Sequence, residues 1–489
     1  MIKENIEYEI RLEGNLNISD LESLIFLQSK NCSIHKLRSK YFDTDDFKLL
    51  NNSIGLRVRR ENGNWVQTTK FEAIDQSCYE YNQDIKVQEE TKNYLDIDAL
   101  PSKDFLQNKN YYIDFEFKDF SCKLIQQFEI NINRFSWTIK YLSGKIEISF
   151  DTGFIKKNNT IKTISEIEIE LLEGKNFIIW QLAKEIIRHL PNLKIQFLSK
   201  AFRGYELCDL NWKKHSFKSI KNLQKLHNNI GNGIRDIILQ NIKSISFFFE
   251  RLLVTKDDFL VDLSIISIKS IRYIFHFLTS AGKSLKIEDI GEVSKFKYFN
   301  NPYLNILCKI KILNFVIITL ENEREQGDYL KKNKANLSAF FLKEKSIQFA
   351  LLEKIVMSKK TTNIFLDYGF IANKIPFLIN DRNDECMEIV SKVKTQLEQR
   401  LRSFRCTAIN RAAISTDFYL MALSSLLSIV NKQEETVKYR FYDHTDEEKN
   451  FFTNYEINKF KKFINERLTN QKISKKFKED IFSQITKIL

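Results

Sequence analysis

The chain has 489 residues and a net charge of +13. Hydrophobic residues make up 43% of it and charged residues 28%, and this composition excludes an intrinsically disordered protein. Its 13 Gly and 4 Pro also exclude collagen-like and low-complexity chains. The 7 Cys are scattered without a C-x-x-C pair, which argues against a zinc site and favours reduced thiols in the cytoplasm.

The opening residues carry acids where a signal peptide needs an apolar run. The most apolar stretch, 304–320, is shorter than a membrane span and contains Lys309 and Lys311. We therefore expect neither a transmembrane segment nor a membrane partner.

The first part of the chain, up to about residue 208, alternates apolar and charged residues with period two. Such runs occur at 6–12, 56–59, 146–151 and 166–171, and each predicts a strand with one apolar and one charged face. Asn62-Gly63-Asn64 predicts a hairpin between two strands. Helices are expected at 19–29 and at 176–189.

The second part changes to helical spacing. The expected helices are 230–255, 263–281, 303–321, 341–357, 384–401, 416–431 and 454–469, with Pro302 and Pro376 as interruptions. The predicted organisation is an α+β domain over residues 1–208, followed by an all-α helical bundle over 217–489.

The charge differs sharply between the two parts. Residues 1–208 hold 29 Lys and Arg against 31 Asp and Glu, whereas the rest of the chain holds 47 and 32. A net charge of +15 on the helical part predicts a polyanionic partner. Nucleic acid is disfavoured, because the helical part shows no nucleic-acid-binding motif.

Several predicted strands carry like charges in a row on one face. Glu7 and Glu9 share a face, and so do Arg57 and Arg59, and Glu166, Glu168 and Glu170. A solvated sheet face is one interpretation. A closed barrel with a polar lumen explains all these strands together, because alternate residues of every strand then point inward. Carboxylates suit Mg²⁺ or Mn²⁺ and Arg suits phosphate, so such a lumen predicts a metal-dependent polyphosphate site.

The opening Glu7-Tyr8-Glu9-Ile10-Arg11 resembles the E-x-E-x-K signature of the CYTH superfamily, the triphosphate tunnel metalloenzymes. Later motifs follow in the family's order. They are Tyr41-Phe42-Asp43-Thr44, Gly55-Leu56-Arg57-Val58-Arg59, the strand ending at Lys70, Arg134 with Trp137, Ile146-Glu147 leading to Asp151, the strand with Glu166, Glu168 and Glu170, and Ser199 to Tyr205. A basic helical domain after such a domain resembles the CYTH–CHAD architecture of bacterial inorganic triphosphatases, although its CHAD part is divergent.

The resemblance implies an eight-stranded antiparallel β-barrel tunnel with flanking helices in the first domain, and an inorganic triphosphatase activity. It implies metal ligation of Mg²⁺ or Mn²⁺ by Glu7, Glu9, Asp151, Glu166, Glu168 and Glu170. It implies triphosphate binding by Arg57, Arg59, Lys70, Arg134, Lys200 and Arg203, and catalytic roles for Arg11 and Glu168.

Position 11 departs from the family, whose signature ends in Lys. Arg keeps the charge but is essentially never deprotonated, so phosphate anchoring would survive the change and proton transfer would not. Open alternatives are therefore a catalytically weak protein that binds triphosphate or polyphosphate, a thiamine or nucleoside triphosphatase, and an enzyme like class IV adenylate cyclase. The sequence also leaves a homo-oligomer open.

Overall fold

The computed structural model describes residues 2–28, 30–61, 63–72, 77–87, 94–108, 115–208, 230–265, 301–322 and 328–378, with isolated positions at 267–268, 271, 462–463, 465–466 and 479. The predicted helices 384–401 and 416–431 lie outside the described residues, as do most of 263–281 and 454–469. Among the described residues, no helix is long and apolar enough to cross a membrane.

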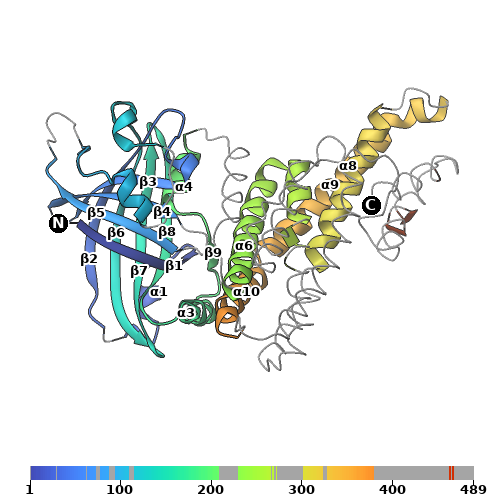
Figure 1. The fold of residues 1–489 in the computed structure, drawn as a ribbon. Helices are drawn as coiled ribbons and strands as arrows, with labels where there is room; N and C mark the ends of the chain where they lie inside the picture. The colour runs from blue at the N-terminus through green and yellow to red at the C-terminus, as the bar shows by residue number, and fades with distance from the viewer. Residues whose placement is uncertain are drawn as a thin grey trace. The chain divides into compact units, whose positions relative to one another are not determined.

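The first part of the chain is an antiparallel β-barrel (Figure 1). Its strands are β1 (Ile2–Glu13), β2 (Ser33–Asp43), β3 (Ile54–Glu61), β4 (Asn64–Glu72), β5 (Ser77–Ile85), β6 (Ile125–Tyr141), β7 (Gly144–Lys157), β8 (Thr160–Glu173) and the short β9 (Lys194–Gln196). The order β5-β4-β3-β2-β6-β7-β8-β1 closes on itself, because residues 2–8 of β1 pair with β5 and residues 9–13 pair with β8. The predicted eight-stranded barrel is confirmed.

The described residues also form helices and 3-10 turns. They are α1 (Ile18–Glu22), η1 (Leu50–Asn52), α2 (Lys103–Asn108), η2 (Phe117–Lys123), α3 (Phe177–His189), α4 (Lys200–Glu206), α6 (Ile230–Thr255), α8 (Asn301–Asn322), α9 (Asp328–Val356) and α10 (Lys359–Leu378). The helix expected at 19–29 is only the five residues of α1, which are followed by turns. The prediction at 230–255 matches α6, and α9 begins earlier than predicted.

Apolar side chains fill two distinct places around the barrel. Outside it, Leu56 and Val58 of β3 pack with the segment that contains α2 and η2. At one end of its interior, Phe128 and Ile130 of β6 pack against Tyr205 of α4. Alternate residues of β8 show the same division, since Ile167 and Ile169 are fully buried while the glutamates between them face inward. The apolar packing thus leaves the remaining interior to charged side chains.

Helix α10 is a finding that the sequence pattern did not predict. Cα packing divides the chain into one unit of residues 1–222 and 359–374 and a second of 223–358 and 375–489. Within the first unit, Lys184 of α3 forms an ion pair with Asp367 of α10, and Phe177 meets Phe370 edge-to-face. Pro376 lies in the last turn of α10, so it did not prevent the helix.

The second unit is helical, as predicted. Phe249 of α6 stacks on Tyr303 of α8 with ring centroids 5.6 Å apart. Lys345 of α9 lies 3.1 Å from Asp258 and donates to Asn314 of α8 at 2.7 Å. A packed helical body of this kind is consistent with a separate domain, but the boundary at 208–217 stays a prediction because residues 209–229 lie outside the described part of the chain.

Candidate active site in the barrel lumen

Strand register brings the predicted acids to one face of the sheet. In β7 and β8, Asp151 is opposite Glu166 and Glu147 is opposite Glu170. Strand β1 adds Glu9 opposite Glu170 and Arg11 opposite Glu168. Residues directly opposite one another in an antiparallel pair share a face. The closed barrel turns that face inward, so these charged side chains meet in the lumen.

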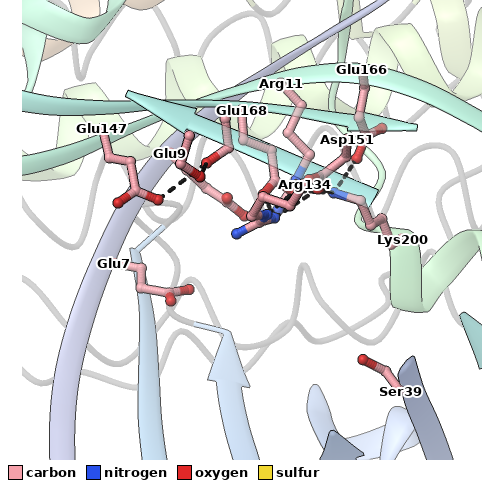
Figure 2. A network of polar contacts seen from close by, with 12 residues as sticks. Glu7, Glu9, Arg11, Ser39, Arg134, Glu147, Asp151, Glu166, Glu168 and Lys200 are labelled. Atoms are coloured by element: carbon pink, nitrogen blue, oxygen red, sulfur yellow. Dashed lines mark hydrogen bonds and ion pairs between the residues drawn. The ribbon is translucent and has the colours of Figure 1, made fainter. Parts of the chain in front are cut away.

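A tight ionic cluster occupies the lumen beside α4 (Figure 2). Carboxylate oxygens of Asp151, Glu166 and Glu168 lie within 4.8 Å of one another, the spacing of a metal-ligand group. Asp151 and Glu166 are completely buried. Three carboxylates forced this close together in a buried site need cations, and the hard oxygen donor set suits Mg²⁺ or Mn²⁺.

Three basic side chains of the protein already contact this triad. Arg134 donates two parallel hydrogen bonds to Asp151, at 2.8 and 2.6 Å, and also pairs with Glu168. Arg203, which is 1% exposed, pairs with Glu166. Lys200 Nζ lies between all three carboxylates, and the resulting charge of the cluster is neutral.

A second group of carboxylates lies next to the triad and has fewer cations. It consists of Glu7, Glu9, Glu147 and Glu170. Burial, reinforced by the charges of Glu7, Glu9 and Glu147, raises the pKa of Glu170 to about 8. Burial also raises the pKa of Glu7, although Lys70 lies only 2.8 Å away. Surplus negative charge of this kind favours a bound cation.

Arg11 connects the two acidic groups. Its guanidinium pairs with Glu9 and lies 3.6 Å from Glu168. Burial alone would lower the pKa of Arg11, but the neighbouring glutamates outweigh it and raise that pKa. The raised pKa favours a permanently charged Arg11, which suits ion pairing rather than proton transfer.

The opposite wall of the lumen is rich in cations. Arg57 donates to Thr68 at 3.2 Å, and Lys70 pairs with Glu7. Arg59 donates to Ser39 Oγ at 3.1 Å and has no carboxylate at ion-pair distance among the described residues. Burial, together with the charges of Arg57 and Arg134, lowers the pKa of Arg59 to about 10. A half-buried guanidinium with other cations nearby favours the approach of an anion.

Glu80 of β5 is a lumen residue that the sequence reasoning missed. It is 6% exposed, pairs with Lys70 and lies 3.8 Å from Arg57. Its burial would raise its pKa, but these two cations outweigh burial and hold that pKa below its usual range. The alternation of Cys78, Glu80 and Asn82 with Tyr79 and Tyr81 was the available signal for an inward-facing polar row.

Asp43 holds the helix that supplies Lys200 and Arg203. This fully buried carboxylate accepts hydrogen bonds from the backbone N–H groups of residues 44, 49 and 50, at 2.7 to 2.9 Å, and from the Tyr205 hydroxyl at 3.1 Å. Gly204 lies so close to Phe128 that a Cβ there would fall 2.1 Å from the ring. The motif around Asp43 thus fixes α4 against the barrel rather than contributing a ligand.

Comparison with known proteins assigns the barrel part of the chain to a family. Residues 5–205 match the CYTH domain family. This part of the chain is a CYTH domain. It is 27% identical over 176 residues to an inorganic triphosphatase of Haemophilus influenzae, an alignment that covers 35% of this chain and 46% of that protein.

Two solved structures are also similar to the CYTH domain. One, a proposed adenylate cyclase of Bacillus halodurans, is 19% identical with a TM-score of 0.28 and covers 41% of this chain and 97% of its own. The other, a proposed adenylyl cyclase of Hippeastrum described as having a dominant triphosphatase activity, is 16% identical with a TM-score of 0.27 and covers 41% and 95%. The CHAD-like interpretation of residues 217–489 stays a prediction.

Proposed function

We propose that the chain hydrolyses inorganic triphosphate to diphosphate and phosphate in the lumen of its CYTH domain. The observation that carries the proposal is the half-buried guanidinium of Arg59, which has no carboxylate at ion-pair distance among the described residues, in the same lumen as a carboxylate triad. An anion and a divalent cation can then be held side by side. The distant relationship to an inorganic triphosphatase supports the same substrate.

The triad fits Mg²⁺ or Mn²⁺, since it offers three carboxylate oxygens within 4.8 Å and the neighbouring glutamates repel one another. A bound divalent ion would polarise a phosphoryl oxygen and lower the pKa of water. Asp151, Glu166 and Glu168 would hold it, with Glu7, Glu9 and Glu170 available for a second ion.

The basic residues of the lumen would bind and orient the triphosphate. Arg57, Arg59 and Lys70 line one wall, and Arg134 and Lys200 approach from the side of the triad. Spread along the lumen, they match the negative charges of a short linear polyphosphate. Arg203 is held by Glu166 in a fully buried pair, and we assign it to fixing that carboxylate rather than to direct phosphate contact.

Phosphate release from tripolyphosphate tests the proposal, measured with Mg²⁺, with Mn²⁺ and with chelator. The Glu168→Gln variant removes a triad carboxylate, whereas Glu173→Gln changes an exposed glutamate at the end of the same strand. We expect metal-dependent release in the wild type and in Glu173→Gln and its loss in Glu168→Gln. Equal release by the wild type and both variants would place the activity elsewhere.

The alternative is that the lumen binds triphosphate without turnover. The double ion pair of Arg11 with Glu9 and Glu168 favours it, because a permanently charged guanidinium replaces the family's lysine there. Tight metal-dependent binding of tripolyphosphate without phosphate release would support this alternative.

We further propose long-chain polyphosphate as the ligand of the basic helical part, on the strength of its excess of Lys and Arg. Competition between polyphosphate and duplex DNA in a binding assay separates this ligand from nucleic acid. Displacement of bound polyphosphate by equal amounts of DNA would contradict it.

A further inference from the structure

The ammonium group of Lys200 lies where a cation ligated by the triad would lie (Figure 2). Its Nζ is 2.7 Å from Asp151, 2.5 Å from Glu166 and 2.5 Å from Glu168. These are the same three carboxylates whose oxygens form the metal-ligand group. The side chain of Lys200 is only 9% exposed, so water does not screen these contacts effectively.

A divalent ion and this ammonium cannot share the triad. Mg²⁺ takes oxygen ligands at about 2.0–2.1 Å and therefore needs the space between the carboxylates. The three negative charges are already matched by Lys200, Arg134 and Arg203, so an added ion would leave an excess of two positive charges in a buried cluster. Such an excess is costly unless a cation withdraws or an anion enters.

Among these three basic side chains, Lys200 is the one that is free to withdraw. Arg203 is almost completely buried in its pair with Glu166, and Arg134 is held by two parallel hydrogen bonds to Asp151. Lys200 is a single ammonium on a flexible four-carbon stem at the first position of α4. The body of that helix is fixed by Tyr205, so only the side chain needs to move.

We propose that the Lys200 ammonium takes the place of the metal: it holds the three carboxylates together when no divalent ion is bound, and a divalent ion displaces it when one binds. The released ammonium then faces the lumen, where it can contact the triphosphate; this second step rests on the proposed function, whereas the displacement does not. Because displacement costs free energy and an anion in the lumen recovers part of it, metal and triphosphate bind cooperatively.

The binding of Mn²⁺ in the absence of any phosphate tests the displacement. Free Mn²⁺ is counted by electron paramagnetic resonance in titrations of the wild type and of Lys200→Met, which keeps most of the stem but not the charge. The matched control is Lys156→Met, which removes a charge from an exposed, outward-facing position of β7. We expect Lys200→Met to bind Mn²⁺ at least about tenfold more tightly than the wild type, and Lys156→Met to change little.

Unchanged or weaker Mn²⁺ binding by a folded Lys200→Met would overturn the proposal. A second measurement uses only the wild type, in case that variant does not fold. Reductive methylation of lysines followed by mass spectrometry reports how accessible Lys200 is. Its modification should rise when Mn²⁺ is added, whereas equal modification with and without Mn²⁺ would refute displacement. Both readouts are independent of phosphate release, so a failure of the triphosphatase assay leaves them intact.

Discussion

The contact between Gly204 and Phe128 gives the sharpest test of how α4 is positioned. In a Gly204→Ala variant the new Cβ would lie 2.1, 2.4 and 2.5 Å from three atoms of the Phe128 ring. Overpacking of a core costs about 1–3 kcal/mol, and contacts this short belong at the upper end. Alanine also favours a helix over glycine by about 1 kcal/mol, so the expected net loss of stability is about 2 kcal/mol.

The sign of this change makes the test decisive. Without the clash, helix propensity alone would make Gly204→Ala stabilising. The measurement is urea unfolding followed by tryptophan fluorescence. The control is Gly55→Ala, where the nearest atom is Lys70 Cβ at an ordinary 3.9 Å, and no loss is expected there. In the presence of Phe128→Leu, the substitution Gly204→Ala should lower the free energy of unfolding by about 1 kcal/mol less than it does alone, because the smaller side chain removes the clash.

A wild-type or higher stability of Gly204→Ala would show that the Phe128 ring does not constrain this position. It would mean that α4 can leave the Phe128 ring without cost. The positions of Lys200 and Arg203 would then not be fixed by this contact.

Three further predictions concern single side chains. In the folded protein the pKa of Glu170 is raised to about 8, so its contribution to stability is present at low pH and is lost as the pH rises from about 4.5 to 8. In chelator, Glu170→Gln should therefore be more stable than the wild type only at the alkaline end. An equal gain at pH 5 and pH 9 in thermal unfolding would contradict this. Arg11→Lys should change the rate of phosphate release less than tenfold and leave the pH–rate profile unshifted, since the raised pKa of Arg11 keeps it charged. A titrating group that appears in or disappears from that profile would show that the residue at position 11 transfers protons. Tyr205→Phe should lower the free energy of unfolding in urea by about 1–2 kcal/mol, because buried Asp43 loses the hydrogen bond from the Tyr205 hydroxyl. An unchanged free energy of unfolding would show that this hydrogen bond does not hold α4.

Much of the barrel could be predicted because apolar and charged residues alternate along its strands with period two. In β8, Glu166, Glu168 and Glu170 alternate with isoleucines. The closed barrel places the glutamates in the lumen and buries the isoleucines on the other face of the sheet. The pattern could not show which carboxylate meets which cation. Lys200 was expected on phosphate, yet its ammonium lies among three carboxylates. That placement depends on the distance between α4 and β8, which no local pattern encodes.

Two features of the structure, Glu80 and helix α10, could not be predicted from the sequence pattern. Glu80 alternates with the aromatic residues Tyr79 and Tyr81, so its strand lacks the row of like charges that marked the others. Helix α10 does not follow from the sequence pattern because Pro376 predicts an interruption there. In the structure Pro376 lies in the last turn of α10, with most of the helix before it.

Two adjacent arginines of β3 provide the test of whether triphosphate binds in the lumen of the CYTH domain. Arg59 faces the lumen and donates to Ser39, whereas Arg60 is exposed, with its guanidinium 5.8 Å from the Trp65 ring centroid. The measurement is calorimetric titration of tripolyphosphate with Mn²⁺ into the wild type, Arg59→Gln and Arg60→Gln. We predict that Arg59→Gln loses at least about tenfold in affinity, since a charge-assisted hydrogen bond contributes about 1.5–3 kcal/mol, and that Arg60→Gln binds like the wild type. Equal affinity of Arg59→Gln and the wild type, or an equal loss in both variants, would contradict binding in the lumen.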